Sequence, residues 1–469
     1  MSRPVYNPKF ELFKKAIIGK KVGVLGVGVS NLPVIELLNN LGAIVYAFDK
    51  KEEKDFDEKA LEILHSNTKG GCVLGKGYLD NLNDVDIIIK TPGIRPDIPE
   101  LVKAEENDVV VTSEMEIFLS ICPCKIIGVT GSDGKTTTTT LIYEILKANG
   151  YNCHVGGNIG KPLLPVIEFI DPNDIAVLEL SSFQLQTMQT SPEISVVTNV
   201  APNHLDYHKD MDEYTNAKKN IFLNQNHTGK LIINSENAIT NSFEDDAVGE
   251  VAKFSLHNRV SHGTHIYRGK IYYDDEMVLN VKDIILPGEH NVDNYLAAIC
   301  ATYPLVDTSS IVKVAKTFGG VAHRLEFVRE YKGVKFYNDS IASSPTRTTA
   351  GLKSFDDKVI LIAGGYDKKI PFDGFGKIIL EKTKGVMLIG DTSNKIRCEI
   401  EQESEKQGKT IPLVGCNTLE EAVKSAFALA KDNDVVLLSP ACASFDMFKN
   451  FEERGNAFKQ IVALLGQEE

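Results

Sequence analysis

Short apolar, β-branched runs alternate with longer amphipathic stretches through most of the chain. This alternation is typical of βαβ units, in which helices connect parallel strands. Three blocks of the pattern can be separated: the first begins near residue 20, the second near residue 126 and the third after residue 326. The pattern therefore predicts an α/β protein with three domains in series, which we place at residues 1–114, 115–321 and 322–469.

The second block is interrupted between about residues 225 and 290. The stretch THIYRGKIYYDDEMVLNV, residues 264–281, has the turn residues and short apolar runs of β-hairpins. It predicts either an inserted β region or the edge of a sheet. The following stretch, residues 286–302, indicates a turn that enters a helix.

Composition narrows the classes of function. The chain has 469 residues and a formal net charge of -13, which argues against nucleic acid or an anionic membrane as the main partner. No run approaches the ~18 uninterrupted apolar residues of a membrane span, and the N-terminus lacks an apolar core of signal-peptide length. We therefore expect a cytoplasmic protein. Its eight scattered cysteines are expected to be reduced and mostly buried.

A glycine turn in the first block indicates a nucleotide site. Gly26 and Gly28 follow a strand-like run, and Asp49 ends the next such run. This arrangement resembles a dinucleotide fingerprint, but Asn31 occupies the position of its third glycine. From these residues alone, NAD or FAD, another nucleotide diphosphate, and structural turn glycines all remain open.

The second block opens with IIGVTGSDGKTTTTTL, residues 126–141. Its glycines do not have the Walker spacing, because Gly128 lies six positions before Gly134 instead of five. Successive backbone amides and the start of the following helix would still hold phosphate oxygens, with Lys135 neutralising charge and the Thr136 hydroxyl available to Mg²⁺. The predicted phosphate-binding residues are Gly131, Ser132, Asp133, Gly134, Lys135, Thr136 and Thr137.

Two further strand ends carry candidate ligands. Glu179 lies near the end of the apolar run IAVLEL, where an oxygen donor for Mg²⁺ is expected. His204 and Asp206 follow another such run, at the sheet edge where α/β proteins collect their sites. Taken singly, Glu179 could equally be a solvated charge at a strand end, and a lone histidine such as His204 is more often a hydrogen-bonded loop residue than a ligand.

The order of the motifs is similar to that of the Mur ligases. The matching stretches are TGSDGKTT, GGNIG, LELSSFQL, TNVAPNHLDYH, EYTNAKK, GEHNVDN, HRLE, NDSIASSPT, GGYDKK and SPACASFDMFKNFEERGNAF. The resemblance as a whole spans the chain from Gly26 to Phe458, and the last stretch resembles the D-glutamate-adding members. The resemblance implies a Rossmann-like UDP-substrate domain, a central P-loop-type ATPase domain with a parallel sheet and a small β region, and a Rossmann-like C-terminal domain that binds D-glutamate.

The resemblance also implies a reaction. ATP would phosphorylate the carboxylate of UDP-N-acetylmuramoyl-L-alanine, and D-glutamate would attack the acyl phosphate through a tetrahedral intermediate, giving ADP and phosphate for peptidoglycan synthesis. Lys135, Glu179, His204 and Lys218 would be catalytic. Thr136, Glu179, His204 and a CO₂-derived carbamate on Lys218 would hold Mg²⁺ at two sites. Lys219 is adjacent, so the register of the modified lysine is open at this point.

Binding residues follow from the same resemblance. On the ATP side they are Asn291, Asn294, Arg324 and Asp339, in addition to the loop 131–137. Around UDP and the muramoyl-alanine end they are Gly26, Gly28, Ser30, Asp49, Thr91, Pro92, Gly93, Asn158, Ser181 and Gln184. For D-glutamate they are Lys368, Ser444 and Phe451. The resemblance makes a nicotinamide cofactor unnecessary and favours a monomer that neither inserts in a membrane nor binds nucleic acid.

One position departs from the family pattern. Ile341 stands in NDSIASSPT where many members have lysine, so either Arg347 or another cation compensates or the contact is dispensable. The alternatives are a Mur ligase for another amino acid, a polyglutamate synthase, or a catalytically silent sensor of UDP-sugar or ATP on the same scaffold.

Overall fold

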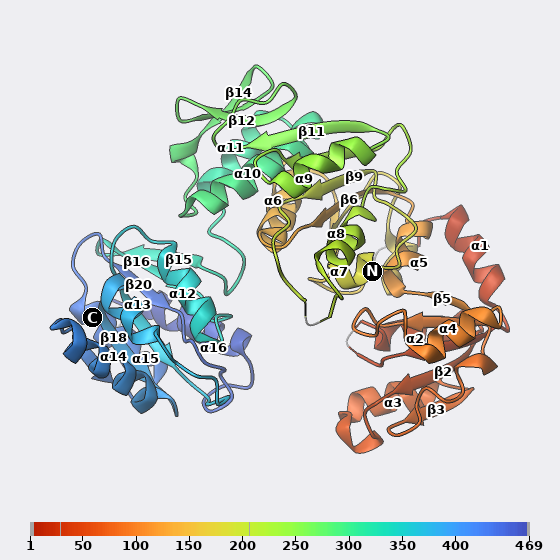
Figure 1. Cartoon of the computed structure of the whole chain (residues 1–469), viewed down its shortest axis with the longest axis horizontal. Coiled ribbons are helices and arrows are strands. Elements are labelled where there is room, and N and C mark those ends of the chain that lie inside the picture. Colours follow the sequence, from red (N-terminus) through yellow and green to blue (C-terminus); the bar gives the residue numbers. More distant parts are fainter. Residues whose placement is uncertain (1–3, 29, 206, 467–469) are drawn as a thin grey trace. The chain divides into compact units, whose positions relative to one another are not determined.

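The computed structural model describes residues 4–28, 30–205 and 207–466. The chain divides into two compact units. The first contains residues 1–283 and 292–314, and the second contains residues 284–291 and 315–469. Figure 1 shows the first unit from red to green and the second mainly in cyan and blue. The first unit holds two separate sheets and the second holds one.

The N-terminal sheet is parallel, with strand order β3-β2-β1-β4-β5. Strand β1 lies between β2 and β4, so the chain reverses direction across the sheet at β1. This topological switch point is where doubly wound folds bind ligands. The strands are β1 (Lys21–Leu25), β2 (Ile44–Asp49), β3 (Gly71–Leu74), β4 (Ile87–Lys90) and β5 (Val110–Thr112). The helices are α1 (Pro8–Ile17), α2 (Leu32–Asn40), α3 (Glu58–Asn67), α4 (Pro99–Glu106) and α5 (Glu114–Ile121).

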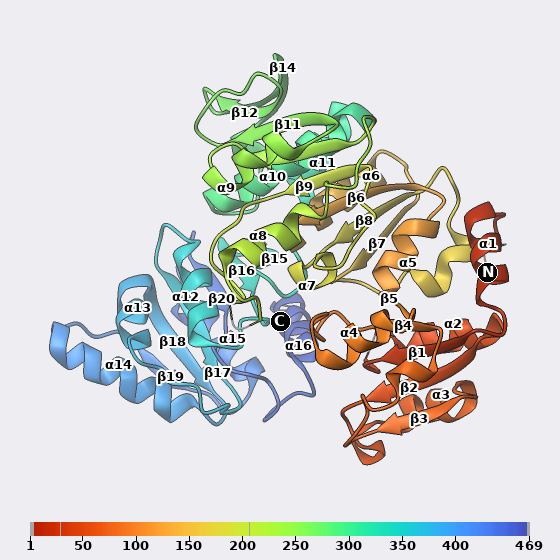
Figure 2. The ribbon, with the colours of Figure 1, turned by 45° about the vertical axis from the view of Figure 1, so that its right-hand side comes forward.

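The central sheet has the order β14-β13-β12-β11-β10-β9-β6-β8-β7, and Figure 2 shows this succession from the hairpin strands to β7. Pairing is parallel from β7 to β12 and antiparallel in the β12, β13 and β14 hairpins. The strands are β6 (Lys125–Thr130), β7 (Cys153–Gly157), β8 (Ile175–Glu179), β9 (Ile194–Val197), β10 (Lys230–Asn234), β11 (Glu250–Ser255), β12 (Gly263–Tyr267), β13 (Lys270–Tyr273) and β14 (Glu276–Asn280). The helices are α6 (Lys135–Ala148), α7 (Ser182–Leu185), α8 (Met211–Lys219), α9 (Ala238–Asn241), α10 (Glu289–Thr302) and α11 (Thr308–Thr317).

The C-terminal sheet has the order β15-β16-β20-β17-β18-β19, and only the β15 and β16 pair is antiparallel among its described strands. The strands are β15 (Glu326–Tyr331), β16 (Val334–Asn338), β17 (Val359–Gly364), β18 (Thr383–Ile389), β19 (Leu413–Gly415) and β20 (Val435–Leu438). The helices are α12 (Pro345–Lys353), α13 (Phe375–Lys382), α14 (Ser393–Gln407), α15 (Leu419–Leu429) and α16 (Phe451–Leu464). Short 3₁₀ segments lie at Glu53–Asp55, Leu82–Asp84, Leu164–Phe169, Ser242–Asp246, Val281–Asp283 and Tyr303–Leu305.

Burial explains why the sequence shows strands as continuous apolar runs. Every residue of β8 and β17 is buried, because helices cover both faces of a parallel sheet. The predicted α/β architecture with predominantly parallel sheets is confirmed. Strands β12, β13 and β14, within residues 263–280, form one edge of the central sheet, as one of the two sequence interpretations expected. The domain boundaries after residues 114 and 321 stay predictions.

The structure bears on two sequence-based expectations, the absence of a membrane-spanning helix and the burial of the cysteines. In the described part of the chain, no helix has both the length and the apolar character needed to cross a membrane. All eight cysteines are free thiols, and five of them are buried. The expectation that most of the cysteines are buried is therefore met, and their reduced state stays a prediction.

Candidate active site

The predicted phosphate loop lies between β6 and α6, at the carboxyl end of the central sheet. Gly131 has φ 149° and Gly134, the residue that caps α6, has φ 79°. A Cβ on Gly131 would overlap the Oγ1 of Thr198, which donates a 2.6 Å hydrogen bond to the carbonyl oxygen of Asp133. The Oγ of Ser132 donates to the carbonyl oxygen of Ala201 at 2.9 Å. Residues that directly follow β9 thus fix the backbone of the loop, which can present amides to an anion.

Lys135 is the first residue of α6 and folds back over this loop. Its Nζ donates to the carbonyl oxygens of Gly131 at 3.0 Å and Ser132 at 2.9 Å. Thr136 and Thr137 follow in the first helical turn, and Thr137 is buried. The ammonium group of Lys135 therefore lies against the backbone of the phosphate loop.

Lys218 approaches the same loop from α8. It is 1% exposed, and its Nζ donates to the carbonyl oxygen of Gly131 at 2.7 Å. Burial, and secondarily the charge of Lys135, hold the pKa of Lys218 well below its ordinary value. Lys219 instead pairs with Asp246 at 2.7 Å near the surface. Of the two adjacent lysines, Lys218 is the one next to the loop.

Glu179 ends β8 beside the loop strand. Its Oε1 accepts a 2.9 Å hydrogen bond from Nδ2 of Asn158, while its buried Oε2 has no hydrogen-bond partner among the described residues. An unpartnered carboxylate oxygen in a buried position fits a cation ligand. Ser181 and Gln184 form a capping box at the start of α7, so their side chains are already paired with each other.

His204 lies in a ring cluster after β9 and has φ 54°, a left-handed conformation. Its ring meets that of Phe183 edge-on, with centroids 4.9 Å apart. Asp206, the neighbouring candidate, lies outside the described residues. Among the described residues, no three His, Cys, Asp or Glu side chains gather as a ready-made metal site.

The two asparagines of α10 are both buried. The Oδ1 of Asn294 accepts a 3.2 Å hydrogen bond from the Thr138 hydroxyl and lies where a Cβ on Gly134 would be. Asn294 therefore adjoins the phosphate loop. Asn291 donates through Nδ2 to the carbonyl oxygen of Pro287 at 2.6 Å and is grouped with the second compact unit.

The predicted UDP residues gather at the carboxyl ends of β1, β2 and β4. Asp49 accepts from the amide of Val27 at 2.6 Å, and a Cβ on Gly26, φ 88°, would overlap Thr91. The sheet topology brings together Gly26, Gly28, Ser30, Asp49, Thr91, Pro92 and Gly93. Sequence reasoning missed Lys90, which is 2% exposed and donates to the carbonyl oxygen of Ile94 at 3.1 Å; burial lowers its pKa to about 8.

In the second unit, Asp339 is buried at the end of β16. Its Oδ2 accepts a 2.7 Å hydrogen bond from the Ser439 hydroxyl, and burial raises its pKa to about 7. Arg324 is exposed. Nη1 of the exposed Arg347 donates to the carbonyl oxygen of Ile341 at 3.4 Å, so its guanidinium contacts the backbone of the residue that stands where the family pattern has lysine.

The predicted D-glutamate residues lie around the ends of β17 and β20. Tyr366 pairs with Ala443 in an isolated β-bridge, which joins the GGYDKK turn to the SPACAS segment. Lys368 is exposed, and its Nζ lies 5.8 Å from the ring centroid of Phe445. Ser444 is buried, and Phe451 begins α16 with its ring edge-on to His323.

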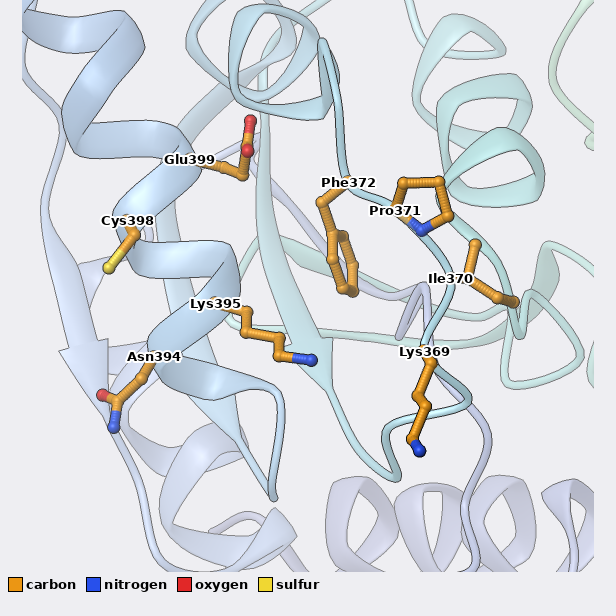
Figure 3. A pocket seen from close by; sticks show the side chains of 8 residues that line it. All are labelled: Lys369, Ile370, Pro371, Phe372, Asn394, Lys395, Cys398 and Glu399. Carbon is orange, nitrogen blue, oxygen red and sulfur yellow. The ribbon is translucent and has the colours of Figure 1, made fainter.

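A cavity of about 520 Å³ lies beside this turn, against α14. Figure 3 shows Lys369, Phe372 and Lys395 around it. Lys395 forms an ion pair with Asp367, and Asp367 accepts the amide of Lys369 at 2.8 Å. These contacts fix the turn that presents Lys368.

Three family models match the chain in the order of its sheets. The Mur ligase MurD-like N-terminal domain matches residues 20–113, the Mur ligase middle domain residues 129–302, and the Mur ligase glutamate ligase domain residues 323–442. The chain belongs to the Mur ligase family. The resemblance drawn from the motifs is thereby confirmed.

Curated members of the Mur ligase family match over nearly the full length. The UDP-N-acetylmuramoylalanine–D-glutamate ligase of Acetivibrio thermocellus is 54% identical over 467 residues, covering 97% of this chain and 99% of that protein. The enzyme of the same name from Clostridium kluyveri is 53% identical over 453 residues, covering 97% and 98%.

Solved Mur ligase structures share the fold at low identity. The UDP-N-acetylmuramate-alanine ligase MurC of Thermotoga maritima has a TM-score of 0.56 at 20% identity, covering 96% of this chain and all of that one. A UDP-N-acetylmuramoyl-L-alanyl-D-glutamate–2,6-diaminopimelate ligase also has a TM-score of 0.56, at 17% identity, covering 91% and 93%.

Proposed function

We propose that this chain joins D-glutamate to UDP-N-acetylmuramoyl-L-alanine and converts ATP to ADP and phosphate, as a step of peptidoglycan synthesis. The observation that carries the proposal is its 54% identity, over nearly the whole length of both chains, with a ligase named for D-glutamate. The phosphate loop at the carboxyl end of the central sheet supports the ATP chemistry.

Activation of the carboxylate gives the reaction its need for ATP. A carboxylate oxygen of the L-alanyl group attacks the γ-phosphorus, and the bond to ADP breaks. The amine of D-glutamate then adds to the acyl carbon and loses a proton, and the tetrahedral intermediate collapses with departure of phosphate. The loop amides and Lys135 would hold the phosphates through both steps.

Residues that fit a magnesium ion surround the loop. Thr136 and Glu179 would hold it, and the unpartnered Oε2 of Glu179 supports this fit. Bound Mg²⁺ would neutralise charge on the transferred phosphoryl group. In this proposal, threonine and phosphate oxygens supply part of the coordination of Mg²⁺. The site therefore does not need three His, Cys, Asp or Glu side chains together, and no such group occurs among the described residues.

We further propose that Lys218 is carbamylated. Its neutral amine would attack CO₂ to form a C–N bond and release a proton, giving an anionic oxygen donor. The lowered pKa of Lys218 supports this step, because only the uncharged amine reacts. The second metal position, near His204 and this carbamate, belongs to the same proposal.

The remaining residues would bind the three substrates. Gly26, Gly28, Ser30, Asp49, Thr91, Pro92 and Gly93 would contact the UDP group, with Asn158, Ser181 and Gln184 toward the muramoyl-alanine end. Asn291, Asn294, Arg324 and Asp339 would contact ATP, and Lys368, Ser444 and Phe451 would contact D-glutamate. A lysine beside a hydroxyl suits a carboxylate through charge-assisted hydrogen bonds. We propose a cytoplasmic monomer.

Phosphate release from ATP tests the function. The assay supplies UDP-N-acetylmuramoyl-L-alanine with D-glutamate, L-glutamate, L-alanine, L-lysine and diaminopimelate in parallel. Release with D-glutamate alone supports the proposal. Release with another amino acid would keep the ATP chemistry and overturn the assignment of the C-terminal site, and no release with any of them would favour a silent sensor.

A further inference from the structure

A single arginine of the N-terminal domain contacts two points of the central domain within the first compact unit. Nη2 of Arg95 lies 2.9 Å from Oε1 of Glu213, and Nη1 lies 3.3 Å from Oε2. Nη1 also donates to the carbonyl oxygen of Tyr207. Arg95 belongs to the turn after β4, while Glu213 is in the first turn of α8. The guanidinium therefore links the turn of one domain to a loop and a helix of the other.

Two neighbours hold the guanidinium in this orientation. Asp97 accepts from Nε of Arg95 at 2.8 Å and from Nη2 at 3.0 Å. Lys209, in the central domain, pairs with the same carboxylate at 2.8 Å. Cations from both domains thus share Asp97. A planar fork held by two carboxylates fixes direction as well as distance, which an ammonium group would not do.

A second link runs through Tyr207. Its hydroxyl donates to the carbonyl oxygen of Pro92 at 3.2 Å, and its ring lies 5.2 Å from the guanidinium carbon of Arg95. Pro92 is one of the residues proposed to surround UDP. The turn that would contact the uridine end of the substrate is thereby joined to Tyr207 by two contacts, one through Pro92 and one through Arg95.

On the catalytic side, Tyr207 shares a ring cluster with His204. Phe183 meets the ring of Tyr207 at 4.3 Å and that of His204 at 4.9 Å between centroids. Glu213 also accepts the amide of Lys209 at 2.7 Å, which braces the start of α8, the helix that carries Lys218. Displacement of Arg95 would therefore change the positions of both the His204 ring and the helix that carries Lys218.

We propose that Arg95 is a positioning residue that couples binding of the uridine end of the substrate to the placement of His204 and of α8. The inference rests on the proposed function, because it assumes that the turn after β4 meets the UDP group. Arg95 itself touches no reacting atom. It links the turn after β4 in the N-terminal domain to the loop of His204 and to α8 in the central domain, so that these segments move together.

Steady-state kinetics provides the first test. Arg95→Ala is expected to raise the KM for UDP-N-acetylmuramoyl-L-alanine and the Mg²⁺ concentration for half-maximal rate by about 10-fold each, and to lower kcat by about 10-fold. The KM for D-glutamate should stay within about twofold. Arg95→Lys should recover only part of the loss, because it restores the charge without the fork. Arg259→Ala removes an exposed arginine from an ion pair with Asp275 in the central domain and is the matched control.

A double-mutant cycle separates coupling from simple destabilisation. Glu213→Gln should reproduce the kinetic pattern of Arg95→Ala, and the combined variant should add little to either. Arg95→Ala could instead lower the melting temperature and change the KM values for UDP-N-acetylmuramoyl-L-alanine, D-glutamate and ATP by the same factor. In that case the role of Arg95 is structural and the proposal fails. Fully additive effects would also overturn it.

Hydrogen exchange gives a readout that does not need turnover. UDP-N-acetylmuramoyl-L-alanine added to the wild type should slow amide exchange in residues 87–95 and also in residues 207–213. In Arg95→Ala the first protection should persist and the second should be lost. Unchanged protection of both segments in the variant would refute the coupling. No protection of residues 87–95 in the wild type would instead refute the proposed substrate site and, with it, the assumption on which the coupling rests.

Discussion

The Nζ of Lys218 lies 2.7 Å from the carbonyl oxygen of Gly131, so a buried lysine from α8 reaches the first residue of the phosphate loop. Its charge is opposed by burial and by Lys135. Burial and the neighbouring charge of Lys135 therefore favour the uncharged amine of Lys218 beside the phosphate loop. This position also distinguishes Lys218 from its neighbour Lys219.

Replacing Lys218 tests the proposed carbamate. Lys218→Ala is expected to lower kcat by about 10- to 100-fold or more, because it removes an oxygen donor that orders the magnesium site. Short-chain carboxylic acids such as acetate or propionate should restore part of the rate by supplying that oxygen. Phosphate release measures both effects. Lys219→Ala is the matched control and should remain near wild type, and full activity of Lys218→Ala without added acid would contradict the carbamate.

A methyl group in the phosphate loop should act locally. Gly131→Ala places a Cβ against Thr198, whose hydroxyl holds the loop, and is expected to lower ATP turnover on the order of 100-fold by displacing the loop. Gly150→Ala is matched in having positive φ, 97°, but its Cβ would meet nothing within 4 Å. It should cost about 1–2 kcal/mol of stability and leave the rate intact. Equal kinetic effects of the two substitutions would show that backbone strain alone is responsible.

Asp339 should make stability depend on pH. Burial raises its pKa from 3.8 to about 7, so the folded state holds this proton more tightly than the unfolded chain does. The stabilising contribution is therefore complete below about pH 4 and is lost as the pH rises through 7. Asp339→Asn removes this loss. The unfolding free energy of the variant relative to wild type should rise between pH 5 and pH 8, by up to about 1.4 kcal/mol per pH unit.

Scanning calorimetry at several pH values measures that difference. Asp373→Asn, an exposed position in the same unit, is the control and should show no comparable trend. A difference between Asp339→Asn and wild type that does not change with pH would mean that Asp339 does not retain its proton in the folded state.

Lys368 should act on one substrate only. Lys368→Ala is expected to raise the KM for D-glutamate by about 10- to 100-fold, because a charge-assisted hydrogen bond to a carboxylate is lost. The KM values for ATP and the UDP substrate should stay near wild type. Lys369→Ala, in the same turn, is the control. A larger effect at Lys369 than at Lys368 would shift the assignment to the lysine that lines the neighbouring cavity.

The sequence by itself determined the local features of this protein. Apolar runs fixed the parallel strands, and the glycines before Lys135 fixed the phosphate loop, because both depend on residues within a few positions of one another. The order of the motifs along the chain indicated the family. The apolar run that precedes Glu179 was enough to place this residue at the end of a strand. These inferences needed no knowledge of which segments meet.

The tertiary structure decided what depends on burial and on distant pairing. Lys218 and Lys219 look alike in sequence, and only the packing of α8 shows that the first is buried against Gly131 while the second pairs with Asp246. Arg95 carried no signal in the sequence, since its partner Glu213 is 118 positions away. Desolvation and ion pairing act through space, so such residues acquire their roles only when the chain has folded.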